Sequence, residues 1–581
     1  MTAPPRKRPA PYSPRPLAST VLLAPRWHTK RSAFVMTAIT LAFVGLAARA
    51  GWVQIAEHEF HVAQGEKRHK QMLALEAKRG DIVDRHGALL AVSLTTYEIW
   101  AEPSRIDRAA LAPLSDLLAL SLTQLHERLD STRLNVLLKR HVDTQTASRI
   151  AGLGMPGITQ APSSKRFYPE GESAAHVVGL TDIDDVGQEG VELAANAQLA
   201  GQPGEREIIR DRLGRMVSDL RPLVPARPGK TVRLTIDRRI QQLAFAQLKL
   251  ALERHRAHAG SAVVLDAATG EILALANAPS FDPNARAALT PRAMRNRAVV
   301  DTFEPGSTIK PLAIATALDA GSVGPDTLID TAPGRYRIGA NTIHDTSNHG
   351  TISVAQALAT SSNIALAKIA LTLPPETLWT AYHRYGLGLP PSLPFPGVAA
   401  GRLRPWQRWR PVEQATMGYG YGLSTSLLQM AQAYTAVAGD GTLQPVVLIA
   451  QDDGAIEPPI DAGVRVMSKR TAASLRTMLE AATLAGGTGR AAHVEGYRVG
   501  GKTGTAWKHA GTGYAKNRYR SLFVGLAPID APKLVVAVMI DEPSGPSYYG
   551  GAVAGPVFAA VAGGALQLLG VPPSPQPAPD A

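Results

Sequence analysis

The 581-residue chain contains no cysteine, which excludes disulfide bonds, thiolate metal sites and a cysteine nucleophile. A chain without cysteine is compatible with reducing and with oxidising compartments, so this absence does not choose between them. The sequence also lacks a histidine-rich or carboxylate cluster with metal-ligand spacing, and we predict neither a metal nor another cofactor. The length indicates several domains of about 150 residues each.

Acidic residues are absent from residues 1–31, a segment that holds seven lysines and arginines. The net charge of the whole chain is +13 at pH 7, so more than half of the excess lies in this short prefix. No array of basic and aromatic residues stands out in the remainder, and we therefore predict no nucleic-acid partner. Because the prefix is rich in proline and arginine, we predict a disordered basic tail.

Charged residues are absent from residues 32–48, and the apolar character continues to residue 55. Residues 32–55 can therefore span a bilayer of about 30 Å as a single transmembrane anchor. The basic prefix predicts a cytoplasmic N-terminus, with everything after residue 55 outside the cytoplasm. The alternative is a cleaved signal peptide, since Ala48-Arg49-Ala50 resembles a cleavage site; the long prefix and the uninterrupted apolar continuation favour an uncleaved anchor.

The remaining chain alternates helical and strand patterns, with a boundary near VPARPGK at residues 224–230. Before the boundary we predict a helix over 57–78, a strand-turn-strand unit over 79–93 and helical segments within 103–160. After it we predict strands at 232–237, 261–277, 498–508, 518–528 and 533–542, and helical regions at 307–380, 413–438 and 555–570. Strands at both ends of this second region, with helices between them, indicate an α+β fold.

The most informative motif is FEPGSTIKP at residues 303–311, in which Ser307 stands three positions before Lys310. A helix that begins at about Ser307 would place both side chains on one face, one turn apart. It would also bring the serine oxygen near the positive end of the helix dipole, which favours a developing alkoxide. Most strings of this kind are solvated helix surface, but no other lysine in the chain follows a serine at this spacing.

Two further motifs follow in chain order. The string ATSSNIA contains the only Ser-x-Asn of the chain, from Ser361 to Asn363, and GGKTGTA contains its only Lys-Thr-Gly, at Lys502, Thr503 and Gly504 before Thr505. Penicillin-binding proteins and serine β-lactamases use these three motifs in this order. Three single occurrences in the right order predict an active-site serine enzyme.

The residue types suit a proton-transfer relay around a serine nucleophile. Ser307 must lose a proton to attack a carbonyl carbon, and Lys310 can accept it if the amine is neutral. Burial and the neighbouring Lys502 ammonium would both lower the pKa of Lys310. Ser361 can then pass a proton to the leaving amine, so we predict these four residues to be catalytic.

The other motif residues are predicted to bind substrate. Asn363 offers an amide to the substrate backbone, and a strand containing residues 502–505 can pair with an extended peptide. The Thr503 and Thr505 hydroxyls can bind a terminal carboxylate, while Gly504 lets the substrate approach the backbone closely. We also predict that the backbone N–H groups of Ser307 and Thr505 form an oxyanion hole.

With these motifs, the strings RGDIVDRHGALLA, RFYPEGESAAHVVG, GYGYGLSTSLLQMAQAY and YYGGAVAGPVF make the chain closely resemble class B penicillin-binding proteins, and within that class the division-specific branch. The resemblance covers roughly residues 30–570. One departure is Trp507, which stands after KTGTA where the family more often has a small or basic residue.

The resemblance implies a C-terminal β-lactamase/transpeptidase-like domain, an antiparallel sheet with flanking helices, after an elongated pedestal module and one transmembrane helix. It implies cross-linking of peptidoglycan stem peptides ending in D-Ala-D-Ala through an acyl-enzyme on Ser307, and covalent inhibition by β-lactams. It also implies an inner-membrane location and partners that include a membrane glycosyltransferase and other division proteins. The implied order is cytoplasmic tail, anchor, dimerisation-type pedestal, transpeptidase domain and proline-rich disordered tail, at residues 1–31, 32–55, 56–224, 225–570 and 571–581.

Other classes of protein also carry these motifs. An elongation-specific class B transpeptidase would carry the same three motifs. A β-lactamase would need to hydrolyse its acyl-enzyme rapidly, and the anchor and the large region before residue 225 argue against it. A β-lactam sensor would be expected to have further membrane helices, whereas the sequence shows no comparable apolar run after residue 55; a division scaffold with little turnover would not need an intact set of motifs.

Overall fold

The structure is a computed structural model that describes residues 29–57, 59–60, 70–210, 216–450, 463–511 and 513–574. The chain divides into two compact units, residues 1–73 with 206–221 and residues 74–205 with 222–581. Most of the predicted basic tail, and the end of the proline-rich tail from residue 575, lie outside the described residues.

The first unit contains one long apolar helix, α1 (Thr29–Ile55). Its segment Lys30–Ile55 is long and apolar enough to cross a membrane, and none of its most hydropathic stretch is buried. Most of a three-stranded sheet, in the order β1-β6-β7, belongs to the same unit; its strands are Lys70–Leu75, Gly204–Arg210 and Met216–Val224. The predicted helix over 57–78 is therefore wrong at its C-terminal end, because residues 70–75 pair in this sheet instead of forming a helix.

The N-terminal part of the second unit, residues 74–205, lies within the predicted pedestal module and is built around a small sheet in the order β4-β3-β2-β8, with β5 also paired to β3. The strands are β2 (Ile82–Val83), β3 (Leu89–Ala101), β4 (Val136–Val142), β5 (Ile158–Phe167) and β8 (Val232–Arg233). The helices are α3 (Ala112–Leu118), α4 (Leu122–Leu129), α5 (Thr144–Gly152), α6 (Ala175–Val178), α7 (Gly190–Ala194) and α8 (Asn196–Leu199). Helices α3 to α5 bury leucines against β3 and β4, so the predicted helical region 103–160 also contains strands.

A buried ionic trio joins distant segments of the pedestal. Glu192 on α7 accepts from Arg79 at 2.6 Å and from Arg166 on β5 at 2.6 Å, and all three side chains are at most 2% exposed. Two cations around one anion, removed from water, are held only because each charge has a hydrogen-bonded partner. The trio therefore ties the segment before β2, the strand β5 and helix α7 into one structure.

The C-terminal part of the second unit is built on a five-stranded antiparallel sheet in the order β10-β9-β19-β18-β17. Its strands are β9 (Ala259–Asp266), β10 (Ile272–Ala278), β17 (Gly500–Ala510), β18 (Gly513–Ala527) and β19 (Leu534–Asp541). Strand β19 is apolar on both faces: Val535 and Ala537 belong to one hydrophobic cluster, while Val536 and Val538 belong to the other. A strand buried on both faces requires helices on both sides of the sheet.

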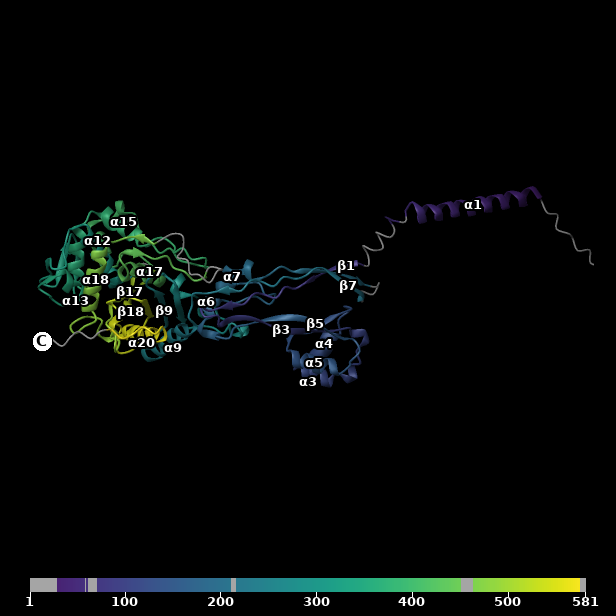
Figure 1. The fold of residues 1–581 in the computed structure, drawn as a ribbon, viewed down its shortest axis with the longest axis horizontal. Coiled ribbons are helices and arrows are strands. Elements are labelled where there is room, and N and C mark those ends of the chain that lie inside the picture. Colours follow the sequence, from purple (N-terminus) through teal and green to yellow (C-terminus); the bar gives the residue numbers. More distant parts are fainter. Residues whose placement is uncertain are drawn as a thin grey trace, which may run out of the picture. The chain divides into compact units, whose positions relative to one another are not determined.

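Helices cover both faces of this sheet. On one face α9 (Arg238–His255) packs beside α20 (Gly555–Leu568), as Figure 1 shows, and on the other α17 (Leu427–Ala438) packs against β9 and β19. Helix α12 (Lys310–Asp319) lies in the same cluster as α17. The remaining helices are α10 (Pro291–Met294), α11 (Arg297–Val300), α13 (Val354–Thr360), α14 (Asn363–Leu371), α15 (Pro375–Arg384), α16 (Pro411–Met417), α18 (Lys469–Ala481) and α19 (Gly550–Val553).

The α+β fold with an antiparallel sheet and flanking helices is confirmed, with one difference inside the predicted helical region 307–380. Two short strand pairs interrupt it, formed by β11 (Leu328–Asp330) with β14 (Thr351–Ser353) and by β12 (Arg335–Ile338) with β13 (Asn341–His344). A further pair joins β15 (Thr442–Leu443) to β16 (Val464–Arg465). These strands are short and largely solvent-exposed, so they lack the alternation of apolar residues that predicts a strand.

Candidate active site

The Ser307 segment is a tight turn held against the GYGYG loop at residues 418–422. Ser307 lies in a 3-10 turn, Gly306–Ile309, which leads directly into α12 at Lys310. The Gly306 N–H donates to the Gly420 carbonyl at 3.1 Å, and a Cβ on Gly420 would lie 2.1 Å from the Gly306 oxygen. Gly420 also has a φ of +92°, so both conformation and space require glycine there. The Ser307 hydroxyl is half-buried, and no described residue is hydrogen-bonded to it.

The Lys310 amine is fully buried and reaches the Ser361–Asn363 turn. Its Nζ lies 2.6 Å from the Ser361 carbonyl oxygen, 2.8 Å from Asn363 Oδ1 and 3.2 Å from Ser361 Oγ. The carbonyl and the amide oxygen can only accept, whereas the serine hydroxyl can also donate. A neutral amine can therefore donate to the two fixed acceptors and turn its lone pair toward a hydroxyl.

Burial is the main cause that holds the pKa of Lys310 well below its ordinary value, followed by the charge of Lys502. The carboxylate of Asp345 acts in the opposite direction and favours the charged form. Lys502 itself is fully buried, and burial lowers its pKa to about 7. Two buried amines that repel each other are a recognised arrangement for keeping one of them neutral.

The Ser361–Asn363 turn connects α13 to α14. Ser361 ends α13 in the left-handed conformation with φ +63°, which is uncommon for a residue other than glycine. Ser362 caps α14 by accepting from the Ala365 N–H at 3.0 Å. Asp345, in the loop after β13, accepts from this same turn. The sequence reasoning missed Asp345, because no motif links it to a turn that follows it by 17 residues.

Strand β17 is an edge strand of the five-stranded sheet and contains residues 502–505. The Lys502 amine lies 3.1 Å from the Thr503 carbonyl oxygen, and Thr505 Oγ1 accepts from the Gly550 N–H at 3.0 Å. A Cβ on Gly504 would lie 2.9 Å from Thr308 Cγ2, so this glycine lets β17 pack beside the Ser307 turn. The structure thus assembles all eight predicted site residues around that turn.

The wall of the cleft beyond β17 is aromatic. Trp507, 40% exposed, lies 4.6 Å from Tyr519 between ring centroids, and Tyr519 stacks on Tyr548 at 4.1 Å. A cavity of about 530 Å³ is lined by both Trp507 and Asn363, with tyrosines 419, 421 and 514 on its walls. The departure at Trp507 therefore places an indole ring in the wall of the same cavity as a predicted substrate-binding residue.

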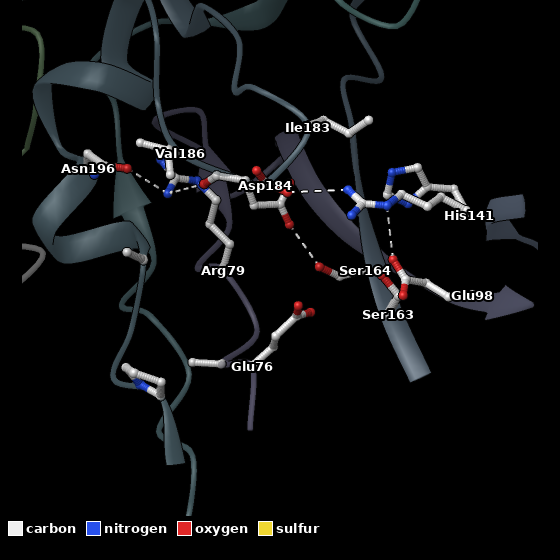
Figure 2. A pocket seen from close by; sticks show the side chains of 15 residues that line it. Glu76, Arg79, Glu98, His141, Ser163, Ser164, Ile183, Asp184, Val186 and Asn196 are labelled. Carbon is white, nitrogen blue, oxygen red and sulfur yellow. Dashed lines mark hydrogen bonds and ion pairs between the residues drawn. The ribbon is translucent and has the colours of Figure 1, made fainter. Parts of the chain in front are cut away.

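In two other clusters of charged side chains, the charged groups form ion pairs with residues of the protein itself. In a pedestal cavity of about 250 Å³, Arg140 pairs with Glu98 at 3.2 Å and with Asp184 at 3.3 Å. Figure 2 shows Glu98 and Asp184 among the side chains that line this cavity. The structure also brings His258, Asp541 and Glu542 together, a cluster that sequence spacing did not reveal. Three cations bind its carboxylates, namely Lys508, Arg518 and Arg520. We assign neither grouping a ligand.

Comparison with known proteins agrees with this architecture. The family model described as "Penicillin binding protein transpeptidase domain" matches residues 260–563, and "Penicillin-binding Protein dimerisation domain" matches residues 74–234. The chain is similar to the probable peptidoglycan D,D-transpeptidase PenA of Neisseria meningitidis, with 41% identity over 97% of each chain. It is also similar to the peptidoglycan D,D-transpeptidase FtsI of Escherichia coli, with 36% identity over 94% of this chain and 92% of that one.

Among solved structures, penicillin-binding protein 3 of Mycobacterium tuberculosis, complexed with aztreonam, is 30% identical and has a TM-score of 0.68. The match covers 87% of this chain and 98% of that one. Identity at this level over nearly the whole length, together with the two family matches, establishes the relationship. The chain belongs to the penicillin-binding proteins, with a transpeptidase domain and a dimerisation domain.

Proposed function

We propose that the protein is a peptidoglycan D,D-transpeptidase that cross-links stem peptides through an acyl-enzyme on Ser307. The observation that carries the proposal is the fully buried Lys310 amine, one turn from Ser307 and within hydrogen-bonding distance of Ser361 and Asn363. A lysine in this setting is neutral often enough to act as a base, which an exposed lysine is not. The names of the relatives support the same reaction class.

In the acylation step, Lys310 takes the proton of the Ser307 hydroxyl as the oxygen attacks the carbonyl carbon of the penultimate D-alanine. The bond from that carbon to nitrogen breaks, and the terminal D-alanine leaves after its nitrogen receives a proton through Ser361. The amine of a second stem peptide then attacks the Ser307 ester, gives up a proton to the same relay and restores the serine. The N–H groups of Ser307 and Thr505 are proposed to stabilise the oxyanion in both steps.

Substrate binding is assigned to β17 and the Asn363 side chain. Lys502, with Thr503 and Thr505, would bind the terminal carboxylate of the donor, and the free edge of β17 would pair with the donor backbone. β-Lactams would enter the same site and form a slowly hydrolysed ester on Ser307. In this assignment Gly504 serves the packing of β17 on the turn as well as the approach of substrate.

We further propose a septal role, on the strength of the similarity to FtsI. In this assignment residues 1–31 are cytoplasmic, residues 32–55 anchor the chain in the inner membrane, and residues 56–224 and 225–570 are the pedestal and transpeptidase domains outside the cytoplasm. A membrane glycosyltransferase and other division proteins are the partners that such a role requires. A fluorescent fusion in dividing cells tests it: signal along the side wall instead of the septum would favour the elongation-specific alternative.

The reaction is tested with the full-length protein in detergent, a pentapeptide donor ending in D-Ala-D-Ala and an amine acceptor. We expect release of D-alanine together with a donor–acceptor product, and neither from Ser307→Ala. Labelling with a penicillin should be retained over the course of the assay. Rapid turnover of the penicillin without a donor–acceptor product would support the β-lactamase alternative and contradict the proposal.

A further inference from the structure

One carboxylate accepts three hydrogen bonds from the Ser361–Asn363 turn and the residue after it. Asp345 Oδ1 accepts from the Asn363 N–H at 2.5 Å and from the Ile364 N–H at 3.0 Å, and Oδ2 accepts from the Ser362 hydroxyl at 2.5 Å. A fourth hydrogen bond runs from Asn363 Nδ2 to the carbonyl of His344 at 3.2 Å, next to Asp345 in the chain. The β12–β13 hairpin and the residue that follows it therefore hold this turn in place.

Among the residues that the structure describes, the turn held in this way provides every hydrogen-bond acceptor of the Lys310 amine. Those acceptors are the carbonyl and hydroxyl of Ser361 and the side-chain oxygen of Asn363. Since Ser361 adopts a left-handed conformation that is unfavourable for serine, the turn needs fixed partners to keep this shape. Asp345 supplies them with charge-assisted hydrogen bonds, which are about twice as strong as neutral ones.

Asp345 also supplies a negative charge beside the lysine pair. The charged groups that face Lys310 are Lys502 on β17 and Asp345. The charged side chains on the helices packed against α12 have other partners or are exposed. Lys368, Arg384 and Arg476 donate to backbone carbonyls, Glu480 pairs with Arg498, and His383 stacks on Trp379. Glu376, Lys469 and Arg470 are exposed, and Asp319, at the end of α12 itself, accepts from Thr471. Among the described residues, Asp345 is thus the single anion that favours the charged form of Lys310.

We propose that Asp345 is a positioning residue of the active site, which fixes the Ser361–Asn363 turn on Lys310 and supplies the negative charge beside the Lys310 amine. It touches neither substrate nor reacting atoms, and acts through the turn and through the field at the Lys310 amine. The inference rests on the proposed base role of Lys310. It adds to the three motifs a fourth element, the residue after the β12–β13 hairpin.

Two substitutions separate the functions of Asp345. Asp345→Asn keeps an oxygen for the two backbone N–H groups but removes the charge, whereas Asp345→Ala removes both. Loss of the carboxylate disfavours the ammonium form of Lys310, so its pKa falls and the acidic limb of the acylation profile moves to lower pH in both variants. Asp345→Ala should also acylate about tenfold more slowly at the plateau, as expected when charge-assisted hydrogen bonds are lost.

The experiment measures the acylation rate of the full-length protein by a fluorescent penicillin between pH 5 and pH 9, with the melting temperature of each variant recorded. Asp330→Asn is the matched control, because this exposed carboxylate on β11 accepts only from the Ala332 N–H among described residues and should leave limb and plateau unchanged. A lower plateau with an unmoved limb in Asp345→Asn would reduce Asp345 to a structural role and overturn the proposal. If Lys310→Arg acylates at close to the wild-type rate, the base role of Lys310 is wrong, and this inference is overturned with it.

Discussion

Replacement of Lys310 by arginine tests whether this lysine acts as the general base, beyond its match to the motif. Arginine keeps the positive charge and the approximate length, but it has no neutral form accessible in proteins. The wild-type site is built for an amine that loses its proton: Lys310 is fully buried, with Lys502 as a neighbouring cation. In the variant, a guanidinium would be locked in the charged state and could take no proton from Ser307.

General-base assistance accelerates such steps by about 10² to 10⁴, which corresponds to about 3 to 5 kcal/mol of barrier at about 1.4 kcal/mol per decade. We therefore expect Lys310→Arg to acylate at least a hundredfold more slowly than the wild type. Lys502→Arg keeps the charge that binds a carboxylate and should retain measurable acylation. The two variants differ only in which lysine loses the capacity to be neutral.

The pH dependence follows from the same two groups. The wild-type rate should rise with pH as Lys310 loses its proton, and fall as Lys502, whose pKa burial lowers to about 7, loses the charge that binds carboxylate. Arginine at position 502 stays charged, so Lys502→Arg should lose the alkaline limb. Stopped-flow acylation by a fluorescent penicillin between pH 6 and pH 9 measures these rates. If Lys310→Arg acylates at close to the wild-type rate, the base role is wrong.

Three further predictions concern the structure around the site. Gly420→Ala should displace the Gly306 carbonyl and slow acylation at least tenfold. Gly422→Ala should have a smaller effect, because Gly422 also has positive φ but the nearest atom to its Cβ would be a flexible methionine methyl at 3.3 Å; equal rates would contradict the close-approach argument. Glu192→Gln leaves two buried arginines without a counter-charge and should destabilise the pedestal by about 3 to 5 kcal/mol, read from the denaturant midpoint; a loss below about 1 kcal/mol would show the trio to be dispensable. N-terminal sequencing of membrane-fraction protein should find the uncleaved prefix, and a start at residue 51 would support the signal-peptide alternative.

Much of the transpeptidase part could be predicted because its signals are local. Strands β9, β10 and β19 and the second half of β18 are mainly apolar, and α20 is a long apolar segment, so composition and periodicity identify them. The Ser307 turn was recognisable because Pro305 and Gly306 break regular structure immediately before a helical pattern. In each case the residues that determine the element are the residues within it.

What the sequence did not reveal depends on contacts between distant segments. Residues 335–344 form a hairpin in which polar and charged side chains face solvent, so only pairing to each other makes them strands. The role of Asp345 could not be predicted, because it depends on three hydrogen bonds that its carboxylate accepts from residues 362–364. The packing role of Gly504 likewise comes from Thr308, almost two hundred positions earlier in the chain.

The central claim is that Ser307 is the nucleophile, and identification of the residue that carries a penicillin adduct tests it most directly. Full-length protein is labelled, digested and analysed by tandem mass spectrometry, with Ser307→Ala as the parallel sample. The account predicts a single modified serine, Ser307, and no adduct in the variant, whose fold should be intact because the hydroxyl has no hydrogen-bond partner among the described residues. An adduct on another residue, or one that persists in Ser307→Ala, would contradict the account.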